Sequence, residues 1–199
     1  MAEASRSADF PVRKIEHSFL FRTLIAASLV FFAACQPGGE EPSESTPSPA
    51  ASDFTVEVVD FDGLQAALAE YRGEGMLLNF WAMWCAPCVA ELPDLNEIAQ
   101  AYREKGGKVV AVSYDLMLPG ADSSTIVEET REFLVKRGID IPILIYDADD
   151  YNEVNEFYSL PGEVPVTLAL NAAGEIVDRE DSSSERARFE ELMKKAMGL

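Results

Sequence analysis

From residue 53 to the end of the chain, short runs rich in β-branched and aromatic residues alternate with segments of helical periodicity. This alternation is the strongest constraint on the fold, because strands separated by helices build a sheet whose faces the helices cover. The run at 76–81 is apolar almost throughout, as expected of a strand buried on both faces. The predicted strands are 55–59, 76–81, 108–114, 143–146, 166–170 and 175–178, and the predicted helices are 64–71, 85–105, 125–137, 151–158 and 185–197.

The last two predicted strands are joined in a different way from the others. Only the four residues 171–174 separate them, which is too short for a crossover helix, so this pair is expected to form an antiparallel hairpin. The sequence therefore predicts one α/β domain over 53–199. Its central mixed sheet is flanked by helices and closed by a C-terminal hairpin and helix.

Residues 1–34 have the features of an export signal. Basic residues precede an uncharged apolar run at 23–34, which is shorter than the roughly 20 residues needed to span a bilayer. The run ends in Ala33-Ala34-Cys35, which resembles the lipobox of bacterial lipoproteins. That resemblance implies cleavage before Cys35, attachment of a lipid to Cys35 and a membrane anchor. An uncleaved signal anchor is the alternative.

The segment that follows is predicted to be a disordered tether. Residues 36–52 consist mainly of Pro, Ser, Glu and Gly and contain no large apolar side chain. Such a segment cannot bury enough surface to offset the entropy lost on ordering. With Cys35 at its start, the tether spans 35–52 and leads into the α/β domain.

The charge balance and the histidine count exclude several kinds of function. The chain has 16 Lys and Arg against 35 Asp and Glu, a net charge of -19, which argues against binding nucleic acid or an anionic membrane surface. Its single histidine, His17, lies in the predicted export signal. The mature chain therefore has no histidine for Ser-His-Asp or Cys-His catalysis, or for a zinc or haem site. We expect no metal and no cofactor.

Two cysteines, Cys85 and Cys88, follow the buried run at 76–81 closely. Behind them apolar residues recur at steps of three and four, which predicts a helix lying on a sheet. Cys85 is then at the helix N-terminus, where free backbone N–H groups and the helix dipole favour a thiolate. Cys88 lies one turn further on, on the buried side. An exposed attacking thiol and a shielded resolving thiol are the requirements of dithiol exchange.

Three structural interpretations of this pair compete with the catalytic one. A disulfide across so short a ring would stabilise the fold by only about 2 kcal/mol. A zinc site needs two further ligands, and the mature chain offers only Cys35. Two inert buried thiols are the third possibility, but the exposed start of a helix is a poor place to bury them.

The segment 80–88, FWAMWCAPC, resembles the active site of thioredoxin-fold proteins. Glu91-Leu92-Pro93 extends the resemblance to the extracytoplasmic, membrane-anchored thiol-disulfide oxidoreductases of the TlpA/ResA type, from about residue 60 to the C-terminus. This resemblance implies a thioredoxin fold. It also implies that the Cys85/Cys88 dithiol reduces disulfides of exported proteins such as apocytochromes c, with a membrane thiol carrier as electron donor.

The same resemblance implies roles for the neighbours of the pair. Pro165 matches the family's cis proline, and Val164 before it would present its backbone to a substrate strand. Trp84 and Pro87 belong to the motif and are expected to support substrate binding. Val166 departs from the Thr that usually follows this proline.

The proton acceptor for Cys88 needs a separate explanation. Cytoplasmic thioredoxins carry a buried aspartate in the strand before the motif, where this chain has Asn79, and an amide takes no proton at neutral pH. Glu91, on the predicted active-site helix, and Asp115, at the end of the next strand, are the candidates. For each the alternative is a solvated or helix-stabilising carboxylate.

Two other functions stay open at this point. A thiol peroxidase places Thr or Ser three residues before its reactive cysteine, and Ala82 occupies that position here. The domain could also be a client-binding module whose disulfide serves stability alone. The segments 117–124 and 146–158 are candidates for partner choice, with plain connectors as the alternative.

Overall fold

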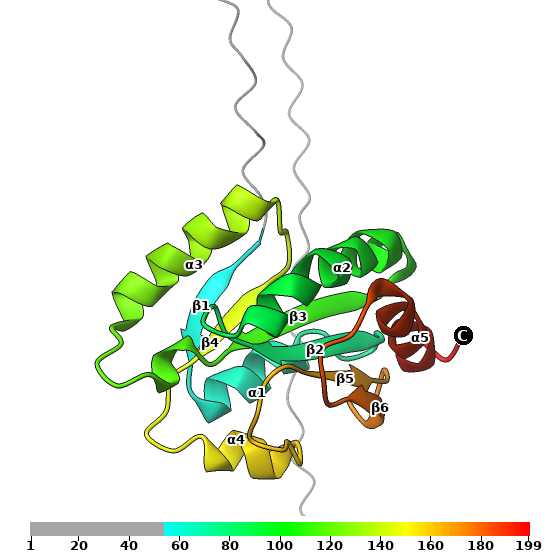
Figure 1. The fold of residues 1–199 in the computed structure, drawn as a ribbon. Helices are drawn as coiled ribbons and strands as arrows, with labels where there is room; N and C mark the ends of the chain where they lie inside the picture. Colours follow the sequence, from blue (N-terminus) through cyan, green and yellow to red (C-terminus); the bar gives the residue numbers. More distant parts are fainter. Residues whose placement is uncertain (1–53) are drawn as a thin grey trace, which may run out of the picture. The chain divides into compact units, whose positions relative to one another are not determined.

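The computed structural model describes residues 54–199, so the predicted export signal (1–34) and tether (35–52), with Cys35, lie outside the described residues. Figure 1 shows a central sheet with helices above and below it. The strands are β1 (Val56–Val59), β2 (Met76–Trp81), β3 (Lys108–Ser113), β4 (Ile143–Tyr146), β5 (Val166–Leu170) and β6 (Ile176–Glu180). The helices are α1 (Phe61–Ala69), α2 (Ala86–Tyr102), α3 (Ser123–Arg137), α4 (Asn152–Phe157) and α5 (Arg186–Ala196), with short 3-10 turns η1 (Arg103–Lys105) and η2 (Asp115–Met117).

The six strands form one mixed sheet in the order β1-β4-β3-β2-β5-β6. β1, β4, β3 and β2 run parallel to one another, whereas β5 is antiparallel to both β2 and β6. The predicted C-terminal hairpin is therefore confirmed. β2 lies inside the sheet with a partner on each side, so its carboxyl end has a fixed position.

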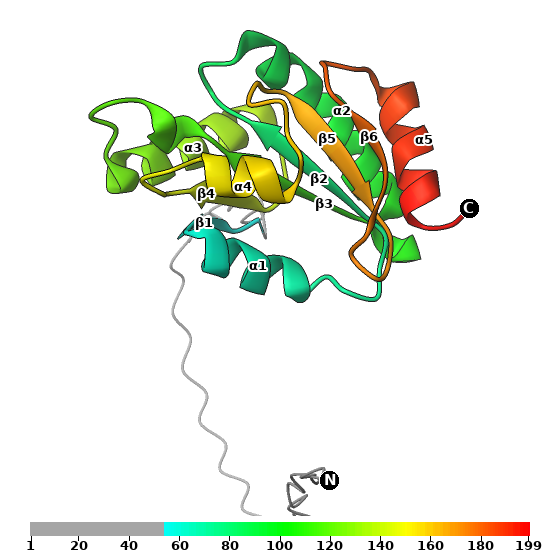
Figure 2. The same cartoon turned by 90° about the horizontal axis from the view of Figure 1, so that it is seen from below.

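Each face of the sheet has its own hydrophobic core. α2, α3 and α5 cover one face, where Leu77 and Trp81 of β2 point. α1 and α4 cover the other face, which receives Leu78 and Phe80. Figure 2, seen from below, shows α1 and α4 on the near side of the sheet. Because side chains alternate along a strand and both faces are covered, every residue of β2 is buried.

The predicted and observed boundaries differ mainly at helix ends, where capping contacts set the limits, and in the edge strand β6. α1 begins at Phe61 rather than at 64, because the Asp60 side chain accepts a hydrogen bond from Gly63 N at 2.8 Å and caps the helix. The predicted helix 85–105 ends as an α-helix at Tyr102 and continues as η1. β6 runs two residues beyond 178, to Glu180. These shifts change neither the order nor the type of any element.

Candidate active site

The two cysteines form a disulfide at the start of α2. Cys85 is the N-cap residue, with extended backbone angles, and its Sγ accepts a hydrogen bond from Cys88 N at 3.3 Å. Pro87 occupies the first turn of the helix, where its missing N–H leaves no intrahelical bond unmade. The strand-to-helix junction predicted from the sequence is thus observed, and the free N–H groups of the helix start face the Cys85 sulfur.

The sequence predicted an exposed Cys85, but the structure shows this residue nearly buried. Only 6% of its surface is exposed, against 0% for Cys88. The reason is the segment before β5: Val164 O lies 3.6 Å from Cys85 Sγ and covers it. The Val164–Pro165 peptide bond is cis, as the resemblance implied. Cys85 is therefore the more accessible sulfur of the pair, and Val164 lies against it.

The two tryptophans of the motif have different environments. Trp81 is fully buried between the sheet and α3, and its ring lies 5.7 Å from that of Phe133. Trp84 is 47% exposed next to the cysteine pair. A large apolar side chain exposed at this position offers contact area to a partner.

Glu91 is buried on α2, three residues after Cys88, so the two side chains lie on the same face of the helix. Its Oε1 accepts a hydrogen bond from Asn79 Nδ2 at 3.0 Å, and its Oε2 accepts one from Ser184 N at 3.2 Å. Asn79 Nδ2 also donates to Thr167 Oγ1 at 3.0 Å. Asn79, which cannot itself take a proton, thus holds the carboxyl that can.

Burial raises the pKa of Glu91 from 4.5 to about 7. Hydrogen bonds from Ser184, Asn79 and Ser183 act in the opposite direction, and the negative charge of Glu180 adds to the rise. Burial wins because an ionised carboxylate loses far more hydration there than three hydrogen bonds return. A carboxyl group of this kind can give and take a proton near neutral pH.

Asp115, the other candidate base, is occupied with a structural task. Its Oδ1 accepts from Met83 N at 2.9 Å and its Oδ2 accepts from Ser113 Oγ at 2.6 Å. Burial also raises the pKa of Asp115, while the bond from Ser113 opposes the rise. The carboxylate thus holds the turn that leads from β2 to Cys85.

Thr167 and Ser184 were missed in the sequence. Thr167 pairs with Asn79 across β2 and β5, a register that follows only once the antiparallel pairing of these strands is known. Ser184 lies in the connection between β6 and α5 and donates its backbone N–H to Glu91. Because every residue except proline has this group, the residue type gives no sign of the contact. Within residues 54–199, no three His, Cys, Asp or Glu side chains gather closely enough to bind a metal ion.

Comparisons with known proteins agree with this geometry. Residues 47–179 match the AhpC/TSA family. The chain is 30% identical over 169 residues to thiol-disulfide oxidoreductase ResA of Oceanobacillus iheyensis, an alignment that covers 82% of this chain and 81% of that protein. It is 32% identical over 126 residues to ResA of Geobacillus kaustophilus, over 63% of this chain and 64% of the relative. The chain belongs to the AhpC/TSA family, among thiol-disulfide oxidoreductases of the ResA type.

Solved structures confirm the thioredoxin fold of this ResA-type chain. A thioredoxin-family thiol:disulfide interchange protein of Chlorobium tepidum superposes with a TM-score of 0.54 at 20% identity, over 65% of this chain and 84% of that one. The exposed lipoprotein thioredoxin Etrx1 of Streptococcus pneumoniae gives 0.53 at 24% identity, over 64% and 88%. No helix within residues 54–199 is both long and apolar enough to span a bilayer.

The raised pKa of Glu91 predicts how stability depends on pH. The folded ResA-type domain holds a proton on Glu91 up to about pH 7, whereas the unfolded chain releases it near pH 4.5. Between these values the folded state binds more protons, so the stability that Glu91 contributes is complete below pH 4.5 and is lost as pH rises through 7.

We therefore expect the unfolding free energy of the oxidised wild type to fall as pH rises from 4.5 to 8. The fall should exceed that of Glu91→Gln by about 2 to 3 kcal/mol. Urea unfolding of both proteins across this range measures the difference. The oxidised form is used because its cysteines do not titrate. A difference that stays constant with pH would show that Glu91 ionises as in water.

Proposed function

We propose that the protein is an extracytoplasmic oxidoreductase, tethered to a membrane through Cys35, that reduces disulfides of exported proteins. The observation that carries the redox part is the Cys85–Cys88 disulfide at the N-terminus of α2, with the less buried sulfur beside the Val164 carbonyl. The partner class follows from the ResA-type membership and from the predicted export signal. Apocytochromes c are the proposed clients, and a membrane thiol carrier is the proposed donor.

In the reduced protein, the Cys85 thiolate attacks one sulfur of a client disulfide. The new bond joins Cys85 Sγ to the client, the client's S–S bond breaks, and its second sulfur leaves as a thiolate that takes a proton from solvent. The Cys88 thiolate then attacks Cys85 Sγ and releases the first client sulfur. Two electrons have passed from the pair to the client, and the Cys85–Cys88 disulfide remains until the thiol carrier reduces it.

Glu91 is the proposed proton acceptor for Cys88. It is the buried carboxyl on the same face of α2, and its pKa of about 7 matches a base that works near neutral pH. Asn79 and Ser184 fix both of its oxygens by hydrogen bonds. The proton of the Cys88 thiol passes to this carboxylate, which leaves Cys88 as a thiolate at the moment when it must attack.

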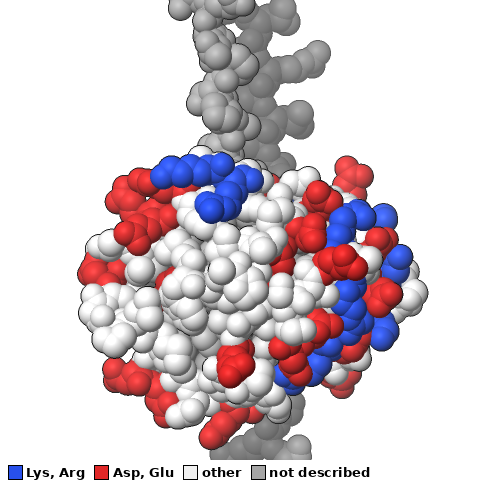
Figure 3. Space-filling view, viewed as in Figure 1, with Lys and Arg blue, Asp and Glu red and all other residues white. Residues whose placement is uncertain are grey.

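The surface around the pair suits a polypeptide client. Trp84, Met117 and Leu118 are each nearly half exposed. Figure 3 shows that the surface over the first turn of α2 and the segment after β3 is largely free of charged side chains, while Lys, Arg, Asp and Glu gather toward the margins. A client strand could add to this face by hydrogen bonding the backbone at Val164, with apolar contacts on either side.

The trapping of clients tests the assignment of the two cysteines. We expect the Cys88→Ser variant to form a stable mixed disulfide with a peptide whose Cys-x-x-Cys-His motif, the attachment site of c-type haem, has been oxidised. The Cys85→Ser variant, with only the fully buried Cys88, should form none. Mass spectrometry of the linked peptides identifies the cysteine.

Two results would contradict this assignment. Unchanged peptide binding by both variants without any trapped species would indicate a binding module. Rapid oxidation of the reduced pair by peroxide, with slow oxidation by the peptide, would indicate a thiol peroxidase.

The direction of electron flow has its own test. A reductase must have a potential below that of its client disulfides, and for this protein we expect at least about a tenfold excess of disulfide over dithiol in a glutathione buffer poised near -220 mV. Alkylation of free thiols after acid quenching measures the ratio. A predominance of dithiol in this buffer would show a potential higher than the one we propose and would contradict the reductase assignment.

The proposed tether is tested by the fate of Cys35. Expressed in a bacterium from the full-length gene, the wild type should fractionate with membranes, and its N-terminal peptide should begin at a diacylated Cys35. Cys35→Ser should lack the lipid and keep residues 1–34 uncleaved at this position. A wild-type protein recovered with residues 1–34 attached and Cys35 unmodified would rule out the lipid tether.

A further inference from the structure

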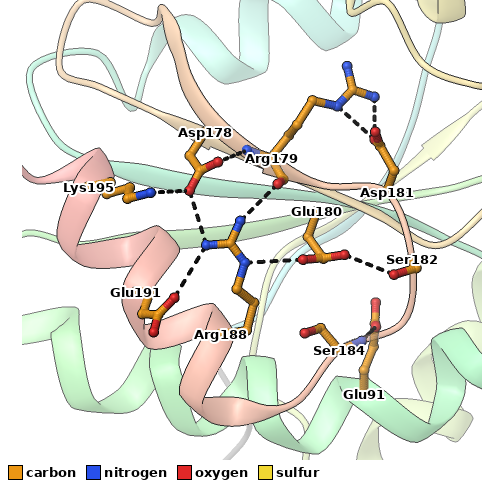
Figure 4. Close-up of polar contacts among 10 residues, drawn as sticks. All are labelled: Glu91, Asp178, Arg179, Glu180, Asp181, Ser182, Ser184, Arg188, Glu191 and Lys195. Carbon is orange, nitrogen blue, oxygen red and sulfur yellow. Dashed lines mark hydrogen bonds and ion pairs between the residues drawn. The ribbon is translucent and has the colours of Figure 1, made fainter.

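The connection between β6 and α5, residues 181–185, lies against the first turns of α2 and closes the site from one side. Ser184 N donates to Glu91 Oε2 at 3.2 Å, and Ser183 Oγ donates to Pro87 O, between the two cysteines, at 3.5 Å. Figure 4 shows Ser184 of this connection facing Glu91 of α2. The connection therefore contributes both to the burial of Glu91 and to one of its hydrogen bonds.

Arg188 links α5 to β6, the strand from which the connection starts. Its Nε donates to Glu180 Oε2 at 3.1 Å, and its Nη1 and Nη2 donate to Asp178 Oδ2 at 3.1 Å and to Arg179 O at 3.0 Å. The other oxygen of Glu180 accepts a hydrogen bond from Ser182 Oγ at 2.9 Å. Figure 4 shows these contacts converging on one guanidinium group. A chain of contacts thus runs from Arg188 through Glu180 to the connection itself.

An isolated ion pair on the surface contributes little, but this cluster differs from one. The side chains of Arg188, Asp178 and Glu180 are between 21 and 25% exposed, so solvent screens them only partly. Lys195 Nζ adds a second cation on Asp178 Oδ2 at 2.8 Å. The planar fork of arginine reaches three acceptors from three separate nitrogens in a fixed geometry, whereas an ammonium group offers its donors from a single atom.

The other end of the connection has separate anchors on α2. Arg186 N donates to Asp94 Oδ2 at 3.0 Å, and Arg186 Nε pairs with Glu97 Oε2 at 2.9 Å. These contacts fix the start of α5 without Arg188. Ser182, nearer β6, is held through Glu180 by the guanidinium contacts, and Ser184 lies between the two sets of anchors.

We propose that Arg188 is a positioning residue for the redox site: it holds the β6–α5 connection on α2, so that Ser184 keeps its N–H on Glu91 and water is kept from that carboxyl. The proposal rests on the role of Glu91 in the proposed function. It assigns a task to a residue of α5 that touches neither cysteine.

The groups that face Glu91 determine what the loss of Arg188 does. They are Cys88 on α2, Asn79 on β2, the serines of the connection and, as the charged group, Glu180 on β6. Opening of the connection hydrates Glu91 and lowers its pKa, because burial is the largest cause of the rise. Removal of Arg188 alone also leaves Glu180 uncompensated, which acts in the opposite direction. The double variant Arg188→Gln/Glu180→Gln removes that opposing charge.

NMR on the oxidised protein tests the proposal directly. In the double variant the titration midpoint of the Glu91 carboxyl carbon should fall by at least about one pH unit relative to Glu180→Gln alone, which has already lost the charge of Glu180. The amide of Ser184 should exchange with solvent at least about tenfold faster. Arg188→Lys, which keeps the charge and loses the fork, should also speed this exchange. The matched control is Arg103→Gln, which breaks an ion pair with Asp140 near the far end of α2 and should change neither quantity.

Folded variants whose Glu91 midpoint and Ser184 exchange equal those of the wild type would overturn the proposal. Arg188→Lys keeps this test available if the double variant does not fold. A failure of the proposed function is recognised separately. If Glu91→Gln reduced clients with the wild-type pH profile, Glu91 would not be the proton acceptor, whatever the Arg188 variants show.

Discussion

The hydrogen bond from Cys88 N to Cys85 Sγ fixes the geometry on which the site depends. It makes a sulfur atom the cap of α2, so the first turn of the helix is oriented toward the atom that we propose carries negative charge in the reduced protein. β2 delivers this cap to a fixed position, because it is buried on both faces and paired on both sides. The same pairing with β5 places Val164 beside the sulfur.

α2 therefore carries two titratable groups whose surroundings favour opposite states: the ionised form of Cys85 and the protonated form of Glu91. At its N-terminus, the helix favours the ionised form of Cys85, the group that must attack. Two turns further on, the burial of Glu91 favours the protonated carboxyl, the form that results when a proton is accepted. Environments that push two titratable groups in different directions are how a protein assigns nucleophile and base. Here Cys85 lies at the helix N-terminus beside Val164, whereas Glu91 lies under the β6–α5 connection.

The sequence predicted most of the sheet because burial left clear signals. β2, β4 and β5 were predicted to the residue, since each is a fully buried and mainly apolar run. β6 was predicted less well because it is a partly exposed outer strand whose charged residues resemble a loop. The redox pair and Glu91 were found by their spacing along one helix. Contacts made by backbone groups and by long connections, as at Ser184, become visible only when the chain is folded. The near burial of Cys85 likewise depends on a segment 79 residues away.

The ion cluster on β6 has a second consequence, for the outer edge of the sheet. β6 has a strand on one side only, and its first two residues, Ile176 and Val177, are both more than 40% exposed. Apolar outer strands of this kind invite pairing with another molecule and hence aggregation. The run Asp178-Arg179-Glu180-Asp181 follows at once, and its fixed charges make a continuous intermolecular sheet unfavourable. The residues that close the redox site thus also limit self-association of a protein that carries an exposed strand.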